Sequence, residues 1–239
     1  MKGFKKINKF LYAKNLFKRL AFIDLEGLNE FTDSFYLSLD KELVAYDSYV
    51  KKSIDQMPKE LHEEFLERMS DDYWKYAEGF PHITGYLLLV RYYSLLEHML
   101  RSVAQNVQND VPTKIAPFIK NLDCSLSEKY LKYLKNAAGF NIDMSNASWA
   151  YIHDVINPIR NCVTHDDGYI ESSKKCAQIK KFISDNPKLI SLTSYNKIEI
   201  KKDFIYKFRE VIASFFEHVF QVWGIWAEEK DKENKTKIV

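Results

Sequence analysis

Residues 83–107 read ITGYLLLVRYYSLLEHMLRSVAQNV, the most regularly patterned stretch of the chain. Its apolar side chains share one broad face of a helical wheel: Leu88, Tyr92, Leu95, Leu96, Met99 and Val103. The opposite face carries polar side chains: Arg91, Ser94, His98, Arg101 and Gln105. Such a division is typical of an amphipathic helix with one side in a protein core. The stretch therefore predicts an α-helical protein.

Most of the remaining chain also predicts helices, because the 239 residues include only 7 glycines and 6 prolines. We expect these helices at residues 10–22, 30–53, 59–76 and 127–138, from about residue 148, and from an N-cap at Asp203 onward. The last one carries an aromatic stripe that is typical of a core or a dimer surface rather than of a cofactor site. The segment Lys188–Lys201 alternates about Tyr195-Asn196 and predicts a small β-hairpin. The expected fold class is all-α with one such hairpin.

The turn signal Gly79-Phe80-Pro81 marks the expected domain boundary. We expect an N-terminal helical extension over residues 1–80 and a helical domain over residues 81–229. A charged tail, residues 230–239, is expected to fray.

The net charge of +2 is too small to indicate a nucleic-acid partner by itself. Its distribution is uneven, because residues 24–78 are heavily acidic and the first 22 residues contain no acid. That basic segment contains Lys2, Lys5, Lys6, Lys9, Lys14, Lys18 and Arg19. One interpretation is a solvated arm, and the other is an arm that binds RNA, a membrane surface or an acidic partner.

The cysteines are Cys124, Cys162 and Cys176, an odd number without metal-type spacing. A reducing compartment fits them best. No run of apolar residues predicts a membrane span, and the region after Met1 lacks the apolar core of a signal peptide. We therefore expect a cytoplasmic protein without membrane insertion.

The segment Asn157–Ile170, NPIRNCVTHDDGYI, contains the residue types of a phosphate site. We expect Asn157 to be an N-cap and Pro158 to begin a helix, so that Arg160 lies in a first turn where free N–H groups favour an anion. Asn161 and His165 are four residues apart and share a face, with Arg160 about 140° away around the axis. One phosphodiester could bridge the three side chains.

Such a trio could cleave RNA without a metal, because a ribose 2′-hydroxyl can attack its own phosphate. His165 would transfer protons near neutral pH, Arg160 would stabilise charge on the transition state, and Asn161 would orient them. One histidine cannot easily be both base and acid, but two copies facing each other across a dimer could divide those roles. No metal or cofactor is expected.

The arginine–histidine spacing alone is weakly specific, since Arg91 and His98 satisfy it as well. An asparagine directly after the arginine makes a chance match much rarer, roughly one chain in a hundred.

The residues RNCVTH, from Arg160 to His165, resemble the RNxxxH signature of the HEPN superfamily, the higher eukaryotic and prokaryotic nucleotide-binding domains. The segment SLLEHML before it and the aromatic final helix are similar to elements of these domains, and the resemblance covers about residues 81–229. It implies an antiparallel helical bundle that forms a homodimer with two signatures in one cleft. Many members are metal-independent endoribonucleases of toxin–antitoxin and phage-defence systems, whereas others bind RNA or nucleotides without cleavage. An antitoxin protein is then a possible partner.

Two features depart from the family pattern. Some members have a tyrosine two residues after the histidine, where this chain has Asp167, and the nearest tyrosine is Tyr169. The carboxylates of Asp166 and Asp167 would repel phosphate unless they point away.

Other interpretations stay open. Arg160 and His165 could belong to an ordinary helix end, and the pairs His153-Asp154 and His165-Asp166 invite comparison with metal-dependent phosphohydrolases, although no further ligands are evident. Five basic side chains are candidate RNA contacts, or else solvated surface: Arg91, His98, Arg101, Lys174 and Lys175. The main alternative to the nuclease is a non-catalytic module that binds RNA, a nucleotide or a protein.

Overall fold

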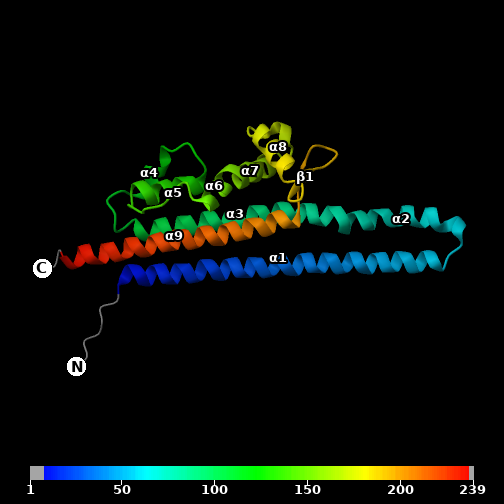
Figure 1. The fold of residues 1–239 in the computed structure, drawn as a ribbon, viewed down its shortest axis with the longest axis horizontal. Coiled ribbons are helices and arrows are strands. Elements are labelled where there is room, and N and C mark those ends of the chain that lie inside the picture. The colour runs from blue at the N-terminus through cyan, green and yellow to red at the C-terminus, as the bar shows by residue number, and fades with distance from the viewer. Residues whose placement is uncertain (1–7, 237–239) are drawn as a thin grey trace, which may run out of the picture. The chain divides into compact units, whose positions relative to one another are not determined.

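The computed structural model describes residues 8–236 and contains helices and one hairpin (Figure 1). The helical elements are α1 (Lys9–Asp55), η1 (Lys59–Leu61), α2 (His62–Trp74), η2 (Lys75–Gly79), α3 (Phe80–Val107), α4 (Ile115–Lys120), α5 (Leu126–Asn136), α6 (Ala147–Tyr151), η3 (Ile152–Ile156), α7 (Asn157–His165), η4 (Ile170–Ser172), α8 (Cys176–Asp185) and α9 (Lys202–Thr236). The strands β1 (Ile190–Leu192) and β2 (Ile198–Ile200) pair antiparallel, with Ser191 opposite Glu199. The predicted all-α class with a small hairpin is confirmed.

Helix α1 is a single helix of 47 residues, where the sequence predicted two. The predicted break fell at residues 23–29, whose weakest helix former is Gly27. One glycine inside a helix costs about 1 kcal/mol relative to alanine, and no proline accompanies it, so the helix continues. It ends before Pro58, as predicted.

The backbone also stays helical through the predicted boundary at Gly79. The π-helical turn η2 joins α2 to α3 and ends two residues before Pro81. Proline lacks a backbone N–H and disturbs the ordinary α-helical pattern, and the wider π turn accommodates it. The division into an extension and a domain at this point stays a prediction.

The described chain divides into two compact units. The first contains the described residues of Met1–Glu26, Tyr92–Ile156 and Arg209–Val239. Its core is aromatic: the rings of Trp149 and Phe215 lie 5.5 Å apart, and those of Phe140 and Trp226 lie 5.2 Å apart. The predicted apolar stripe of α9 is therefore core.

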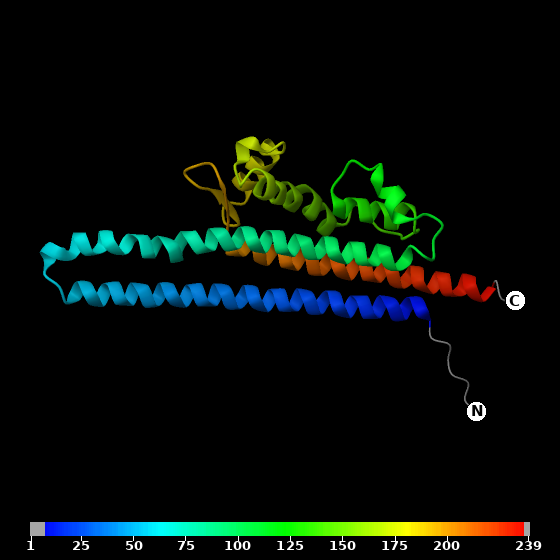
Figure 2. The ribbon, with the colours of Figure 1, turned by 180° about the vertical axis from the view of Figure 1, so that it is seen from behind.

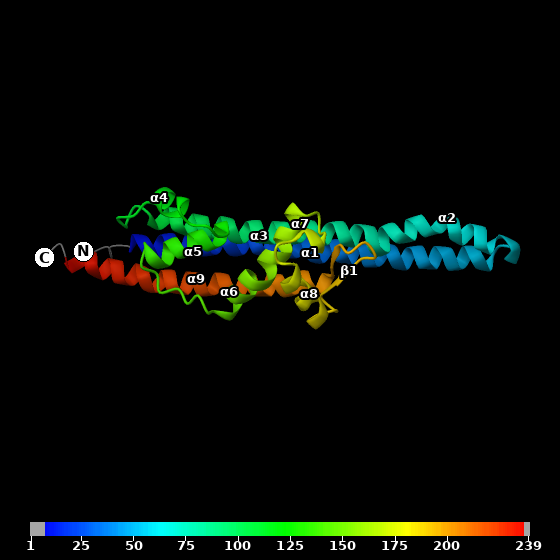
Figure 3. The same ribbon diagram turned by 90° about the horizontal axis from the view of Figure 1, so that it is seen from above.

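Both ends of α5 have residues suited to a helix terminus. The Ser125 side chain accepts a hydrogen bond from the Glu128 N–H, and Gly139 follows the helix with φ +79°. The buried hydroxyls of Tyr93 and Ser127, 2.9 Å apart, join α5 to α3 within this unit. Figures 2 and 3 show α5 beside α3 from behind and from above.

Most of the basic N-terminal segment that the structure describes is part of α1 rather than a separate arm. Lys9 pairs with Asp110 at 2.9 Å and Lys18 with Glu217 at 2.5 Å, both in the first unit. Lys2, Lys5 and Lys6 lie outside the described residues.

Residues 230–239 were expected to fray. The structure differs for residues 230–236, where α9 continues to Thr236. Ion pairs one turn apart support this end of the helix, including Lys230 with Glu233 at 2.8 Å.

The second unit contains Gly27–Arg91 and Asn157–Phe208. Within it, Tyr86 on α3 donates a 2.6 Å hydrogen bond to the carbonyl of Ile198 on β2. The rings of Phe182 on α8 and Phe204 on α9 lie 6.2 Å apart. These contacts join the hairpin to the first turns of α3, and α8 to the first turn of α9. Asp203 lies inside the first turn of α9 rather than at its N-cap.

Candidate functional site

The predicted signature lies in a continuous helical segment rather than at a helix N-terminus. The elements α6, η3 and α7 follow one another without a non-helical residue, so Asn157 is not an N-cap. The π-helical turn η3 ends two residues before Pro158, as η2 does before Pro81. The prediction of free backbone N–H groups around Arg160 is therefore wrong, because the preceding turns supply acceptors for that part of the helix. An anion here would have to be bound by side chains.

Arg160 and Asn161 are in direct contact. The Arg160 Nη1 atom donates a 2.8 Å hydrogen bond to Oδ1 of Asn161, and both side chains are half-buried. A guanidinium has five N–H donors in a planar fork, and this bond uses one of them. The carboxamide thus orients the guanidinium.

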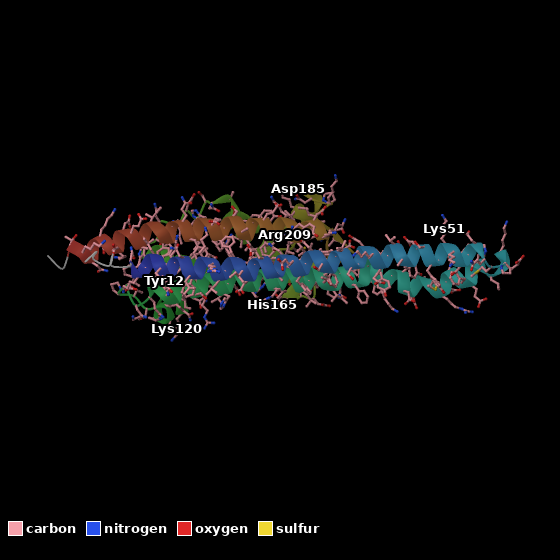
Figure 4. All side chains as sticks on the ribbon, turned by 90° about the horizontal axis from the view of Figure 1, so that it is seen from below. Tyr12, Lys51, Lys120, His165, Asp185 and Arg209 are labelled. Carbon is pink, nitrogen blue, oxygen red and sulfur yellow. The ribbon has the colours of Figure 1, made fainter. Side chains whose placement is uncertain are left out.

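His165 is the last residue of α7 and is exposed. Its imidazole makes no hydrogen bond with any residue of the described range 8–236. In Figure 4, His165 and Asp185 lie on opposite sides of the view, at the ends of α7 and α8. His165 follows Asn161 by one helical turn, which places their Cβ atoms about 6 Å apart. The structure therefore places the trio on one short helix, with the imidazole accessible to a ligand.

Asp167 forms an ion pair with the hairpin. Its carboxylate accepts a 2.6 Å hydrogen bond from Nζ of Lys197, and this partner raises the pKa of Lys197. The same ammonium lies 4.5 Å from the centre of the Tyr169 ring. One of the two carboxylates expected to repel phosphate is thus paired with a cation. Asp166 is half-buried beside His165.

The loop after α7 requires glycine. Gly168 has φ +79°, and a Cβ atom at this position would lie 2.0 Å from the hydroxyl oxygen of Tyr86. The loop is held on both sides, since the Gly168 N–H donates to the Cys162 carbonyl and the Ile198 N–H donates to the Gly168 carbonyl, each at 3.0 Å. The roles of Tyr86 and Lys197 were not predicted from the sequence, because both residues lie far from Gly168 in the chain.

Cys162, inside the signature, is a core residue. Its side chain is fully buried, and its thiol donates to the carbonyl of Tyr169 at 3.5 Å. Burial raises the pKa of Cys162 to about 11, so the thiol is protonated at neutral pH. A role as nucleophile is therefore unsupported.

The candidate RNA contacts are divided between the two units. Arg91, Lys174 and Lys175 are exposed and belong to the unit that contains Arg160. His98 and Arg101 are exposed and belong to the other unit. His98 also lines a small cavity of about 170 Å³ whose other walls are mostly apolar, including Leu95 and Met99.

A larger cavity of about 750 Å³ lies in the unit that contains the signature. Its lining combines aromatic, hydroxyl and charged side chains, among them Trp74, His82, Tyr169, Tyr195 and Lys197. Arg160, Asn161 and His165 line neither of these two cavities.

The described residues contain no group of three histidine, cysteine or acidic side chains placed to hold a metal ion. His153 instead pairs with Asp154 at 2.7 Å and with Glu128 at 3.5 Å.

Between residues 8 and 236, no helix combines the length and apolarity that a membrane span requires.

Comparison with known proteins gives no relative: no family model matches the chain, and neither curated proteins nor solved structures include a significant match. The all-α class is therefore established by the structure itself.

Proposed function

We propose that this protein is a metal-independent endoribonuclease of the HEPN type that acts as a homodimer. The observation that carries the proposal is the hydrogen-bonded pair Arg160–Asn161 followed, one turn later on α7, by the exposed imidazole of His165. A cation, an orienting amide and an accessible proton-transfer group thus belong to one short helix, and this supports the proposal.

The reaction proposed for this trio is intramolecular transesterification of RNA. A neutral imidazole accepts the proton of the 2′-hydroxyl while O2′ forms a bond to phosphorus. The bond from phosphorus to O5′ breaks, and O5′ receives a proton from an imidazolium. The products are a 2′,3′-cyclic phosphate and a 5′-hydroxyl. Arg160 stabilises the charge on the non-bridging oxygens.

This proton balance is the reason for proposing a dimer. The base and the acid act on opposite sides of the phosphorus atom, and each chain supplies one histidine in the signature. His165 of one protomer would be the base and the partner's His165 the acid. We therefore also propose that the two protomers leave an open groove between them, in which the two histidines face the RNA.

The biological setting that we propose is a cytoplasmic toxin or phage-defence effector whose RNA cleavage stops growth. An antitoxin protein or another trigger would control it. The helices before Gly79 would extend the dimer, contact the antitoxin or gate the cleft.

The test is cleavage of total RNA by the purified protein in the presence of EDTA. We expect the wild type to degrade RNA, and Arg160→Ala and His165→Ala to lower the rate by at least about 100-fold. His153→Ala is the matched control, because His153 is an exposed histidine beside an aspartate but outside the signature.

Each other outcome excludes the proposal in a different way. RNA binding without cleavage would indicate the non-catalytic module. Cleavage that EDTA abolishes and His153→Ala impairs would indicate metal-dependent chemistry at the other histidine–aspartate pair.

A further inference from the structure

We propose that the cavity of about 750 Å³, which Tyr169 of the loop after α7 helps to line, binds an unpaired RNA base that carries an amino group. Its volume is within the range of about 300–1,000 Å³ that small-molecule sites occupy. Its walls come from the last residue of α2, from η2, from the first turn of α3, from the loop after α7 and from the hairpin, all within one unit.

Trp74 lines this cavity, and its indole ring is held in place by the backbone behind it. The indole lies against Gly79, where a Cβ atom would be 2.9 Å from Cζ3 of Trp74, so the contact requires glycine. The π-helical turn η2 between the two residues brings them together. Trp74 is nevertheless 57% exposed. A large flat ring that is supported on one side and open to solvent is suited to stacking on a base.

The hairpin presents a second aromatic ring. Tyr195 is 78% exposed at the turn, and its position is set by the Thr193 hydroxyl, which accepts hydrogen bonds from the N–H groups of Tyr195 and Lys197 at 3.3 and 3.2 Å. Tyr169, 42% exposed, also lines the cavity and contacts Lys197. Exposed aromatic side chains on an ordered turn are typical of platforms for single-stranded nucleic acid.

The charges of the lining favour a base over a phosphate. The cation of Lys197 is already paired with Asp167. Two carboxylates, Glu78 and Glu199, line the same cavity and would repel a phosphate. Carboxylates accept hydrogen bonds from the exocyclic amino groups of cytosine, adenine and guanine. Uracil has no amino group, and its base edge offers N3–H as a donor between two carbonyl oxygens that a carboxylate repels. The cavity should therefore discriminate against uracil.

The position of the cavity connects it to the proposed active site. Tyr169 follows His165 by four residues, so their Cα atoms are at most about 14 Å apart. A base near Tyr169 would belong to a nucleotide close to the linkage at His165. The choice of RNA as the ligand that supplies this base rests on the proposed function.

The test is fluorescence anisotropy with labelled oligonucleotides of ten adenosines, ten cytidines or ten uridines, using full-length His165→Ala to prevent cleavage. We expect adenosine and cytidine oligomers to bind more tightly than uridine oligomers. In the same background, Trp74→Ala and Tyr195→Ala should each weaken binding by about 5-fold or more. Tyr12→Ala is the matched control, since Tyr12 is an exposed tyrosine of the other unit and lines neither cavity. The double variant Glu78→Gln, Glu199→Gln should bind uridine oligomers better, because glutamine can donate to the uracil carbonyl groups.

Equal binding by Trp74→Ala, Tyr195→Ala and Tyr12→Ala would overturn this inference. The absence of binding by the His165→Ala protein that carries no further change would also overturn it. The cleavage assay separates it from the proposed function. RNA cleavage that depends on His165, together with unchanged binding in the cavity variants, would leave the nuclease intact and remove the base site. Cavity-dependent binding without cleavage would do the reverse.

Discussion

At the scale of single residues, the signature combines groups with different surroundings. Arg160 and Asn161 are half-buried and bonded to each other, Cys162 is fully buried, and His165 is exposed. A proton-transfer group needs access to the substrate, whereas an orienting pair benefits from restricted motion. The burial pattern therefore matches the role proposed for each side chain.

Gly168→Ala should strongly destabilise the protein. The left-handed backbone at this position costs a non-glycine residue about 1–2 kcal/mol, and the collision with Tyr86 adds a further cost of about 1–3 kcal/mol. Gly139→Ala is the matched control, because Gly139 also has φ +79° but its Cβ atom would meet nothing within 4 Å. The free energy of unfolding in urea measures both costs.

The collision with the hydroxyl can be tested separately. Tyr86→Phe removes that oxygen, so Gly168→Ala should cost less in the Tyr86→Phe background than in the wild type. Equal costs for Gly168→Ala and Gly139→Ala would show that the loop does not pack on α3 as described.

The buried thiol of Cys162 predicts a dependence of stability on pH. Its pKa is raised from 9.0 to about 11 in the folded protein, so the unfolded chain loses this proton first. The stabilisation is complete below pH 9 and declines as the pH rises toward 11. The free energy of unfolding should therefore fall across this interval more steeply for the wild type than for Cys162→Ala. Equal slopes in urea titrations would contradict this assignment.

At the scale of elements, the two π-helical turns have a common sequence context. Each ends two residues before a proline, η2 before Pro81 and η3 before Pro158. From the sequence, Pro158 was expected to begin a helix, because proline suits a first turn, and Pro81 was expected to mark a domain boundary. In the structure, each π turn lets the helix continue despite the missing N–H. Local residue types alone do not distinguish these outcomes, because the choice depends on whether the preceding turns pack.

The amphipathic helix and the hairpin were predictable because their signals are periodic. Leu96 and Val103 on the predicted face are fully buried, and the strands meet about the predicted turn. The exposure of His165 follows from its position at the helix end. The contact of Arg160 with Asn161 was not predicted, because consecutive side chains on a helix do not face each other. The roles of Lys197 and Tyr86 were not predictable, since they depend on pairing between segments distant in the sequence.

The hairpin turn predicts a preference at Asn196, which has φ 59°. Asparagine and glycine tolerate this conformation, whereas a β-branched residue does not. Asn196→Gly should leave the melting temperature nearly unchanged, and Asn196→Val should lower the stability by about 1–2 kcal/mol. Thermal unfolding followed by circular dichroism is the measurement. Indistinguishable melting curves for the two variants would contradict the described turn.

At the scale of the whole molecule, the proposed mechanism requires two chains. Light scattering should therefore give the mass of a dimer. If each site needs His165 from both protomers, a dimer of wild type with His165→Ala is inactive. Adding an excess of His165→Ala, followed by subunit exchange, should lower the activity per wild-type chain toward zero, whereas an excess of His153→Ala should not. Unchanged activity would indicate that each protomer acts alone.

The central claim is that Arg160, Asn161 and His165 cleave RNA by attack of its own 2′-hydroxyl. The most direct measurement is the chemistry of the RNA ends produced in EDTA, determined by mass spectrometry of an oligonucleotide substrate. We expect 2′,3′-cyclic phosphates and 5′-hydroxyls from the wild type, and no products from His165→Ala or from a substrate without 2′-hydroxyls. Products ending in 5′-phosphates, or identical products from His165→Ala, would contradict the account.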